Sequence, residues 1–201
     1  MRILHTESSC GWGGQELRIL DEARGMAGRG HAVTVAAPAQ SRIVPEARRR
    51  GLAAVDLPIA RKRPGGIASL YRWLKRNPVD VINTHSSTDS WLAALACAMP
   101  MFREAPPIVR TRHISASVPD NWATRWLYVS ATRHVVTAGE ALRRQLIESN
   151  GFPADRITSV PTGIDTRRFA PGDRAAARRA LGLPMEAPLV GIVATLRSWK
   201  G

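Results

Sequence analysis

A glycine-rich turn near the N-terminus is the first segment whose residue types suit ligand binding. Residues 8–16 follow a short apolar stretch, and Gly13 and Gly14 directly precede Gln15 and Glu16 at the start of a helical pattern. Glycine lets the backbone approach a ligand closely, and a helix start offers unpaired N–H groups with a partial positive charge. An anion or a sugar hydroxyl suits this arrangement. The alternative is a strand-to-helix turn that binds nothing.

A second polar segment follows another apolar stretch. Residues 83–89 are rich in hydrogen-bonding side chains, among them His85 and Ser86. We expect Ser87 or Thr88 to cap a following helix, because hydroxyl side chains satisfy the first free N–H groups of a helix. The remaining side chains, including those of His85 and Ser86, are then candidates for binding a ligand.

His113 ends a third apolar stretch and is the histidine with the clearest chemical potential. A neutral imidazole donates or accepts a hydrogen bond near pH 7, which suits either contact with a sugar or acid–base catalysis. A structural histidine held by hydrogen bonds is the alternative. His5, His31 and His134 lie within or at the entrance of apolar stretches, so we assign them structural roles.

Short apolar segments alternate with amphipathic helical segments along most of the chain. This order predicts an α/β fold in which a doubly wound, Rossmann-like parallel sheet carries helices on both faces. Ligands of such sheets bind beyond the carboxyl ends of the strands, where the three segments above are expected. The expected strands are 2–6, 32–37, 53–57, 79–84, 107–112, 134–137 and 157–160, and the expected helices are 14–29, 42–50, 67–77, 88–99, 121–132 and 140–150.

A turn-rich stretch over residues 161–172 predicts a domain boundary after about residue 170. Beyond it, the patterns indicate one helix at 173–181 and one strand at 189–194. Two such elements cannot bury a core of their own. We therefore interpret residues 171–201 as the truncated start of a second Rossmann-like domain.

Composition excludes several classes of protein. With 44% hydrophobic and 22% charged residues, the 201-residue chain is typical of a globular protein and not of a disordered one. The apolar run 91–102 is too short to span a bilayer, and the N-terminus lacks a signal sequence, so we expect a cytoplasmic protein. Cys10 and Cys97 form no metal-binding or disulfide pattern, and the loops typical of dinucleotide and Walker phosphate sites are absent.

The net charge of +13 raises the question of an anionic partner. The densest segment, residues 42–63, holds seven basic residues against two acidic ones, a local net charge of +5. A solvated surface and a contact with an anionic membrane are the leading interpretations, and nucleic acid is disfavoured. Trp122, Trp126 and Val129 share one helical face, which either packs in the core or forms a lip at a membrane or an acceptor.

Taken together, several phrases resemble the N-terminal half of a bacterial glycosyltransferase of family 4, which has the GT-B fold. The resemblance covers essentially the full length of the chain, and the spacing of Gly163, Asp165, Phe169 and Pro171 is its most specific part. The phrases that occur in family order are Ile3-Leu4-His5, Gly13-Gly14-Gln15-Glu16, Gly30-His31-Ala32-Val33, Asp80-Val81-Ile82-Asn83-Thr84-His85, Thr111-Arg112-His113, Pro161-Thr162-Gly163-Ile164-Asp165 and Lys200-Gly201.

The resemblance implies a retaining, metal-independent transfer of a sugar from a nucleotide-sugar donor, without a cofactor. Residues 1–170 would bind the acceptor, and residues 171–201 would begin the nucleotide-sugar domain. The turn from Gly13 to Glu16, together with His85 and Ser86, would contact donor or acceptor. His113 would be the catalytic residue beside the transferred sugar, and Lys200 would reach the diphosphate, where positive charge stabilises the leaving group.

The chain departs from the family pattern in two ways. Thr195 stands where the family has a diphosphate-binding arginine, and Arg197 is the candidate to replace it. The rest of the donor domain is not included, so we expect the isolated chain to be inactive. The basic segment favours a cell-envelope glycan or lipid-linked acceptor and a peripheral position on the inner face of the cytoplasmic membrane, with no nucleic-acid partner. The alternative function is a non-catalytic module that binds an acceptor or a membrane.

Overall fold

The computed structural model of the chain describes residues 1–100, 102, 104–114 and 116–192. The chain divides into two compact units, Met1–Thr162 and Gly163–Gly201. The division follows Thr162, whereas the turn-rich stretch led us to place it after about residue 170.

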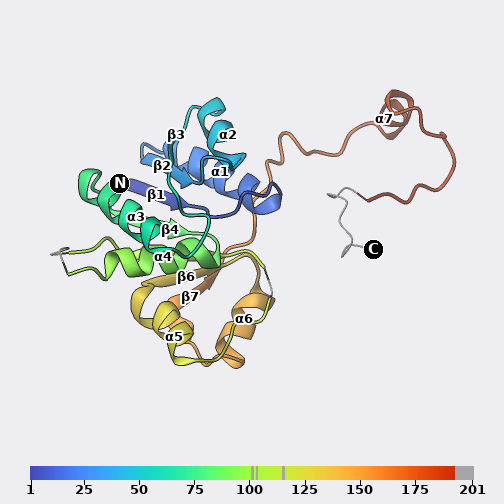
Figure 1. The fold of residues 1–201 in the computed structure, drawn as a ribbon. Helices are drawn as coiled ribbons and strands as arrows, with labels where there is room; N and C mark the ends of the chain where they lie inside the picture. The colour runs from blue at the N-terminus through green and yellow to red at the C-terminus, as the bar shows by residue number, and fades with distance from the viewer. Residues whose placement is uncertain (101, 103, 115, 193–201) are drawn as a thin grey trace. The chain divides into compact units, whose positions relative to one another are not determined.

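The first unit is built on one parallel sheet of seven strands, in the order β3-β2-β1-β4-β5-β6-β7 (Figure 1). Each neighbouring pair runs parallel, which confirms the predicted doubly wound α/β fold. The strands are β1 (Arg2–Thr6), β2 (Ala32–Ala37), β3 (Ala53–Asp56), β4 (Val81–Thr84), β5 (Ile108–Arg112), β6 (His134–Thr137) and β7 (Ile157–Ser159).

Helices cover both faces of this sheet. From β1 the chain winds outward to β3 through α1 and α2, and from β4 it winds in the opposite direction to β7. Because the crossovers are right-handed, the helices of these two halves lie on opposite faces of the sheet. The helices of this unit are α1 (Gly14–Ala27), α2 (Ile43–Arg49), α3 (Pro64–Arg76), α4 (Ser87–Cys97), α5 (Trp122–Arg125), the π-helix η1 (Trp126–Ala131), α6 (Glu140–Glu148) and the 3₁₀ turn η2 (Ala154–Arg156).

Alternate residues of β1 enter the two halves of the core. Ile3 belongs to one buried cluster with Ile19 and Leu20 of α1, whereas Leu4 belongs to another that includes Leu92 of α4 and Leu146 of α6. This alternation follows from the two-residue period of a strand that is covered on both sides. Each face therefore holds its helices by burying aliphatic side chains.

Two helices differ from their predicted form. α3 begins at Pro64 and not at Ile67, because a proline lacks an N–H and fits the first turn of a helix. The predicted helix 121–132 is instead the four-residue α5, capped by Asn121, followed by the π-helical η1. The three residues expected on one apolar face are also separated. Trp126 and Val129 pack against the core, whereas Trp122 is 84% exposed.

The second unit contains the helix α7 (Arg174–Ala180), at the predicted place. Asp173 caps it by accepting from the backbone N–H of Ala175 at 2.8 Å, and the Arg178 guanidinium donates to the backbone carbonyl of Ala187 at 3.0 Å. The strand predicted at 189–194 is wrong for its first four residues, because Leu189–Ile192 carry no strand. A strand needs a partner to satisfy its backbone, and its remaining two residues lie outside the described part of the chain.

Among the described residues, none of the helices combines the length and the apolar character needed to cross a bilayer.

Candidate functional site

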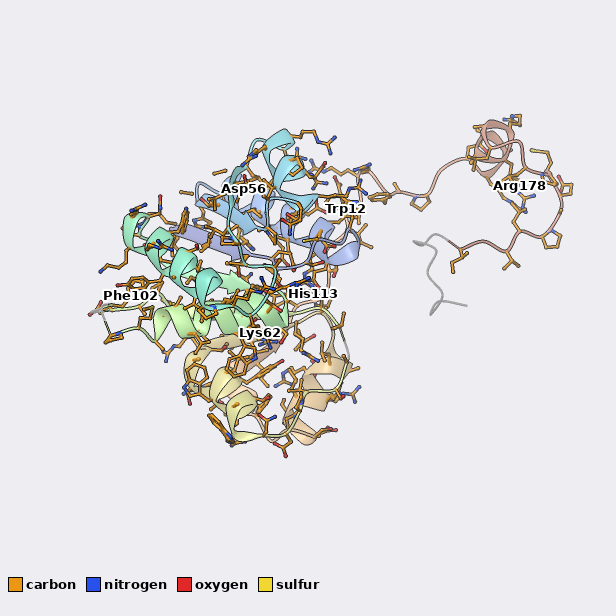
Figure 2. The ribbon with its side chains drawn as sticks, in the orientation of Figure 1. Trp12, Asp56, Lys62, Phe102, His113 and Arg178 are labelled. Atoms are coloured by element: carbon orange, nitrogen blue, oxygen red, sulfur yellow. The ribbon has the colours of Figure 1, made fainter. Side chains whose placement is uncertain are left out.

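The three segments singled out in the sequence meet at one edge of the sheet. β1 and β4 are neighbours, and the chain winds away from them in opposite directions, which makes their carboxyl ends the topological switch point. The Ser8 Oγ after β1 lies 2.8 Å from the Ser86 Oγ after β4, and His85 Nδ1 lies 3.0 Å from Nε2 of His113 after β5. Figure 2 shows His113 and Trp12 of the glycine-rich turn toward this same end of the strands.

Two buried carboxyl groups, which sequence reasoning missed, lie at the centre of this edge. Glu7 and Asp89 are both 0% exposed. The Ser86 hydroxyl lies 2.7 Å from Glu7 Oε1 and 2.8 Å from Asp89 Oδ1. One hydroxyl proton cannot serve two carboxylate oxygens at once, so the arrangement favours an additional proton on one carboxyl group.

Burial raises the pKa of both groups. The pKa of Glu7 rises to about 7, chiefly because burial penalises its charged form and secondly because Asp89 lies close. The pKa of Asp89 is also raised by burial, but Asp89 accepts hydrogen bonds from Thr6 Oγ1 and from the backbone N–H groups of His85 and Ser86. Glu7 accepts from only one described backbone N–H group, that of Ser9 at 2.7 Å, so its carboxylate is less well stabilised and Glu7 is the group that binds the proton.

Asp89 also determines where α4 begins. It is the third residue of the helix, and its carboxylate accepts from the backbone N–H of Ser86, forming a capping box with Ser86 as the N-cap. The predicted caps, Ser87 and Thr88, are instead the first two residues of the helix. The Ser-x-x-Asp spacing from Ser86 to Asp89 was the sequence signal that pointed to both residues.

His85 is the middle member of a row of three histidines. His5 Nδ1 lies 2.9 Å from His85 Nε2, and the other ring nitrogen of His85 contacts His113. Burial lowers the pKa of His5 and of His113 to about 4, and it lowers the pKa of His85 well below its usual value. His5 is buried as expected for a strand residue, but it also belongs to the site.

Arg18 of α1 is a second residue that sequence reasoning missed. It is 4% exposed, and its guanidinium donates to the Val160 carbonyl at 2.9 Å and to Thr162 Oγ1 at 3.1 Å. Its charge contributes to the lowered pKa of His85 and of His113. Arg18 therefore ties the first turns of α1 to the segment after β7 and keeps positive charge beside the histidines. Arg18 also pairs with Glu22 four residues along α1, a spacing that is common on exposed helix faces and does not single it out in the sequence.

The glycine-rich turn lies beside the carboxyl cluster. Gln15 donates a hydrogen bond to Glu7, and Glu16 is 5% exposed beside the turn. The backbone of Gly13 is extended, with φ of −176°, so neither strain nor a left-handed turn explains its glycine. A Cβ at Gly14 would meet no atom within 4 Å, and one at Gly13 would meet only Glu16 Oε2, at 3.8 Å. The space above the turn is therefore open to a ligand.

A cavity of about 530 Å³ lies beyond the carboxyl ends of β2 and β3. Its lining includes Gln40 after β2 and Arg61 and Arg63 after β3. This is the same edge of the sheet as the carboxyl cluster. Of the other predicted site residues, Arg197 and Lys200 lie outside the described residues. Within the described residues, no group of three or more histidine, cysteine or acidic side chains could hold a metal ion.

Comparison with solved structures identifies the architecture. The chain superposes on Anabaena HepE in complex with UDP-glucose with a TM-score of 0.70 at 18% identity, covering 90% of this chain and 50% of that one. A glycosyltransferase from Rickettsia africae gives a TM-score of 0.74 at 18% identity, with coverage of 93% and 51%. These neighbours are GT-B glycosyltransferases, so the first unit has the Rossmann-like fold of a GT-B domain.

Curated relatives point in the same direction. A D-inositol 3-phosphate glycosyltransferase of Stackebrandtia nassauensis is 27% identical over 94% of this chain and 48% of its own length. The enzyme of that name from Acidothermus cellulolyticus is 32% identical over 61% of this chain and 29% of its own length. The chain thus spans about half the length of the first of these relatives, and less of the second. The family model for Glycosyltransferase Family 4 matches residues 12–168, from the glycine-rich turn past β7, and the chain therefore belongs to that family.

Proposed function

We propose that the chain is the acceptor-binding half of a glycosyltransferase that moves a sugar from a nucleotide-sugar donor with retention of configuration and without a metal. The observation that carries the proposal is the convergence of His113, His85 and the open glycine turn at the topological switch point of a GT-B-type domain. The relatives, which are named as glycosyltransferases, and the nucleotide sugar bound to HepE support it.

Each part of the site has a role in this proposal. His113 hydrogen-bonds an oxygen of the transferred sugar, and the backbone N–H groups at the start of α1 meet the donor phosphates or the acceptor. Residues 171–201 begin the donor domain, in which Lys200 and Arg197 stabilise the departing diphosphate. Because donor and acceptor must be held in one site, the 201 residues alone are expected to be inactive.

The acceptor is proposed to be a cell-envelope glycan or a lipid-linked molecule that carries a phosphate. The cavity beyond β2 and β3 supports this class, because Arg61 and Arg63 line it and their guanidinium groups make no ion pair or hydrogen bond with the described residues. Arginine recognises phosphate through paired N–H donors. The relatives named for D-inositol 3-phosphate agree with a phosphate-bearing acceptor.

Sugar transfer by a two-domain enzyme that contains this chain tests the proposal. The enzyme would be supplied with a panel of nucleotide sugars and phosphate-bearing acceptors, with and without a metal chelator. We expect a product whose anomeric configuration by NMR equals that of the donor, formed at an unchanged rate with chelator. An inverted product or a strict metal requirement would contradict the mechanism. Acceptor binding without any transfer would instead favour the non-catalytic module.

The glycine turn provides a prediction that separates folding from function. Gly14→Ala is expected to leave the free energy of unfolding within about 0.5 kcal/mol of wild type, because nothing in the protein meets the added Cβ. The same change should lower sugar transfer by the two-domain enzyme, since the methyl group enters the space left for substrate. Gly66→Ala is the matched control: its Cβ would lie 2.9 Å from the Pro58 carbonyl, so we expect a loss of about 1–3 kcal/mol in urea unfolding. Full transfer by the Gly14→Ala enzyme would contradict a substrate contact at the turn.

We also propose that the protein binds peripherally to an anionic membrane. Within the basic segment 42–63, the ion pairs affect which residues are the best candidates for this contact. Arg48 pairs with Asp56, and Arg49 and Arg50 pair with Glu46, so these charges are partly compensated. Lys62 lies over the Trp91 ring, 5.5 Å from its centre. Arg61 and Arg63 are exposed, and they are the better candidates for lipid phosphate.

Vesicle sedimentation tests this contact. Replacing Arg61 and Arg63 by Gln is expected to weaken binding to phosphatidylglycerol vesicles at low salt by about 10- to 30-fold, at about 1 kcal/mol per charge. Replacing Arg48 and Arg49 by Gln removes the same formal charge and should have a smaller effect. Absence of wild-type binding, or equal losses in the two double variants, would contradict the assignment.

A further inference from the structure

Three imidazole rings lie in a row across β1, β4 and β5. His5 Nδ1 is 2.9 Å from His85 Nε2, and His85 Nδ1 is 3.0 Å from His113 Nε2. The ring centroids are 5.2 Å apart in both pairs, and the planes of the first two rings are within 10° of parallel. Rings whose nearest nitrogens are so much closer than their centroids meet edge to edge. Each contact is therefore an N–H···N hydrogen bond along the row.

The three rings together carry three N–H protons if each ring is neutral. Burial lowers the pKa of all three histidines, so the rings are neutral at pH 7. A neutral imidazole carries one N–H and one bare nitrogen. Two of the three protons occupy the two N···N contacts. The third must sit at one end of the row, on Nε2 of His5 or on Nδ1 of His113.

The two ends of the row differ in their surroundings. His5 is 0% exposed, and its Nε2 is buried with no hydrogen-bond partner in the described part of the chain. His113 is half-buried at the edge of the sheet. A donor N–H buried without an acceptor is rarer in proteins than an acceptor left unused. The proton is therefore disfavoured at the His5 end.

We propose that the third proton lies on Nδ1 of His113, that all three rings are Nδ1–H tautomers, and that His5 and His85 are positioning residues that hold His113 as a hydrogen-bond donor. In this state the Nε2 of His113 is occupied by the N–H of His85, and its Nδ1–H points away from the row. His113 then donates to an oxygen of its ligand and does not remove a proton from a hydroxyl group.

The tautomer of His113 can be inferred without knowing the function of the protein. What it implies for the choice of sugar rests on the proposed function. A fixed N–H donor selects ligands that present an acceptor oxygen at that point, and it penalises those that lack one. Deoxygenation of the donor sugar at the contacted position should therefore reduce transfer, while the tautomer can be measured on the 201-residue chain without any substrate.

NMR of the ¹⁵N-labelled chain at pH 7 tests the tautomers directly. Two-bond correlations from the ring C–H protons distinguish Nδ1 from Nε2, and a protonated nitrogen resonates far from a bare one. We expect His5, His85 and His113 each to show a protonated Nδ1 and a bare Nε2. Free histidine prefers the opposite tautomer, so this result would not arise by default. A protonated Nε2 on any of the three rings, including a doubly protonated ring, would overturn the proposal.

Variants separate a positioning role from a structural one. In His85→Phe the donor to His113 is lost, and the His113 signal should shift to the Nε2–H form. In His85→Asn the amide nitrogen replaces Nδ1, and the Nδ1–H form of His113 should be retained. His134→Phe removes a ring that instead contacts Thr158, at 2.8 Å, and should change nothing at His113. Retention of the Nδ1–H form in a folded His85→Phe protein would show that the row does not determine the tautomer.

Discussion

Replacing His113 by Ala is expected to lower kcat for sugar transfer at least about 100-fold in a two-domain enzyme that contains these residues. The row that ends at His113 holds its ring before substrate arrives, with 3.0 Å between His85 Nδ1 and His113 Nε2. A contact that is already in place costs no reorganisation when charge develops on the sugar. Its loss should therefore affect the transition state more than the bound substrate.

The measurement is radiolabelled sugar transfer, with kcat and KM determined separately. His134→Ala is the matched control, because His134 begins β6 at the opposite, amino end of the strands and contacts Thr158. We expect that variant to keep wild-type kcat. Full activity of the His113→Ala enzyme would refute the role of His113. Robust transfer by the 201 residues alone would instead refute the requirement for a second domain.

The fold could be predicted from the sequence because its strands are short, apolar and separated by clear helical patterns. The bounds of β1, β2 and β6 agree with those predicted to the residue. The convergence of His85 and His113 also followed, since parallel strands bring their carboxyl ends to one edge. The prediction failed at residues 189–192, where an apolar run alone could not indicate whether a neighbouring strand exists.

The interior of the site could not be predicted, because it depends on which strands are neighbours. His5 reaches His85 only because β1 lies beside β4 with His5 opposite Asn83, two residues before His85. That pairing joins positions far apart in the sequence. Glu7 reads as an exposed loop residue until the switch point places it against Ser86 and Asp89. Thus the edge of the sheet was predictable, but the buried polar network behind it was not.

Glu7 is expected to make the stability of the chain fall as the pH rises from about 4.5 to about 7. Its pKa is raised from an ordinary value of 4.5 to about 7, so the folded state binds a proton more tightly than the unfolded state in this interval. The stabilisation is fully present below pH 4.5 and is lost as the pH passes 7. A shift of this size corresponds to about 3 kcal/mol in the free energy of unfolding.

Glu7→Gln removes the titrating group while an amide keeps the shape of the side chain. The measured quantity is the free energy of unfolding of the variant minus that of the wild type. We expect this difference to be about 2 kcal/mol larger at pH 8 than at pH 5, because only the wild type carries a buried second charge beside Asp89 at high pH. Urea unfolding at the two pH values measures this difference and cancels the titration of all other groups. Glu148→Gln is the control, since Glu148 is exposed and ends α6 far along the chain from Glu7. An equal change between the two pH values for Glu148→Gln, or no change for Glu7→Gln, would mean that Glu7 and Asp89 do not compete for a proton.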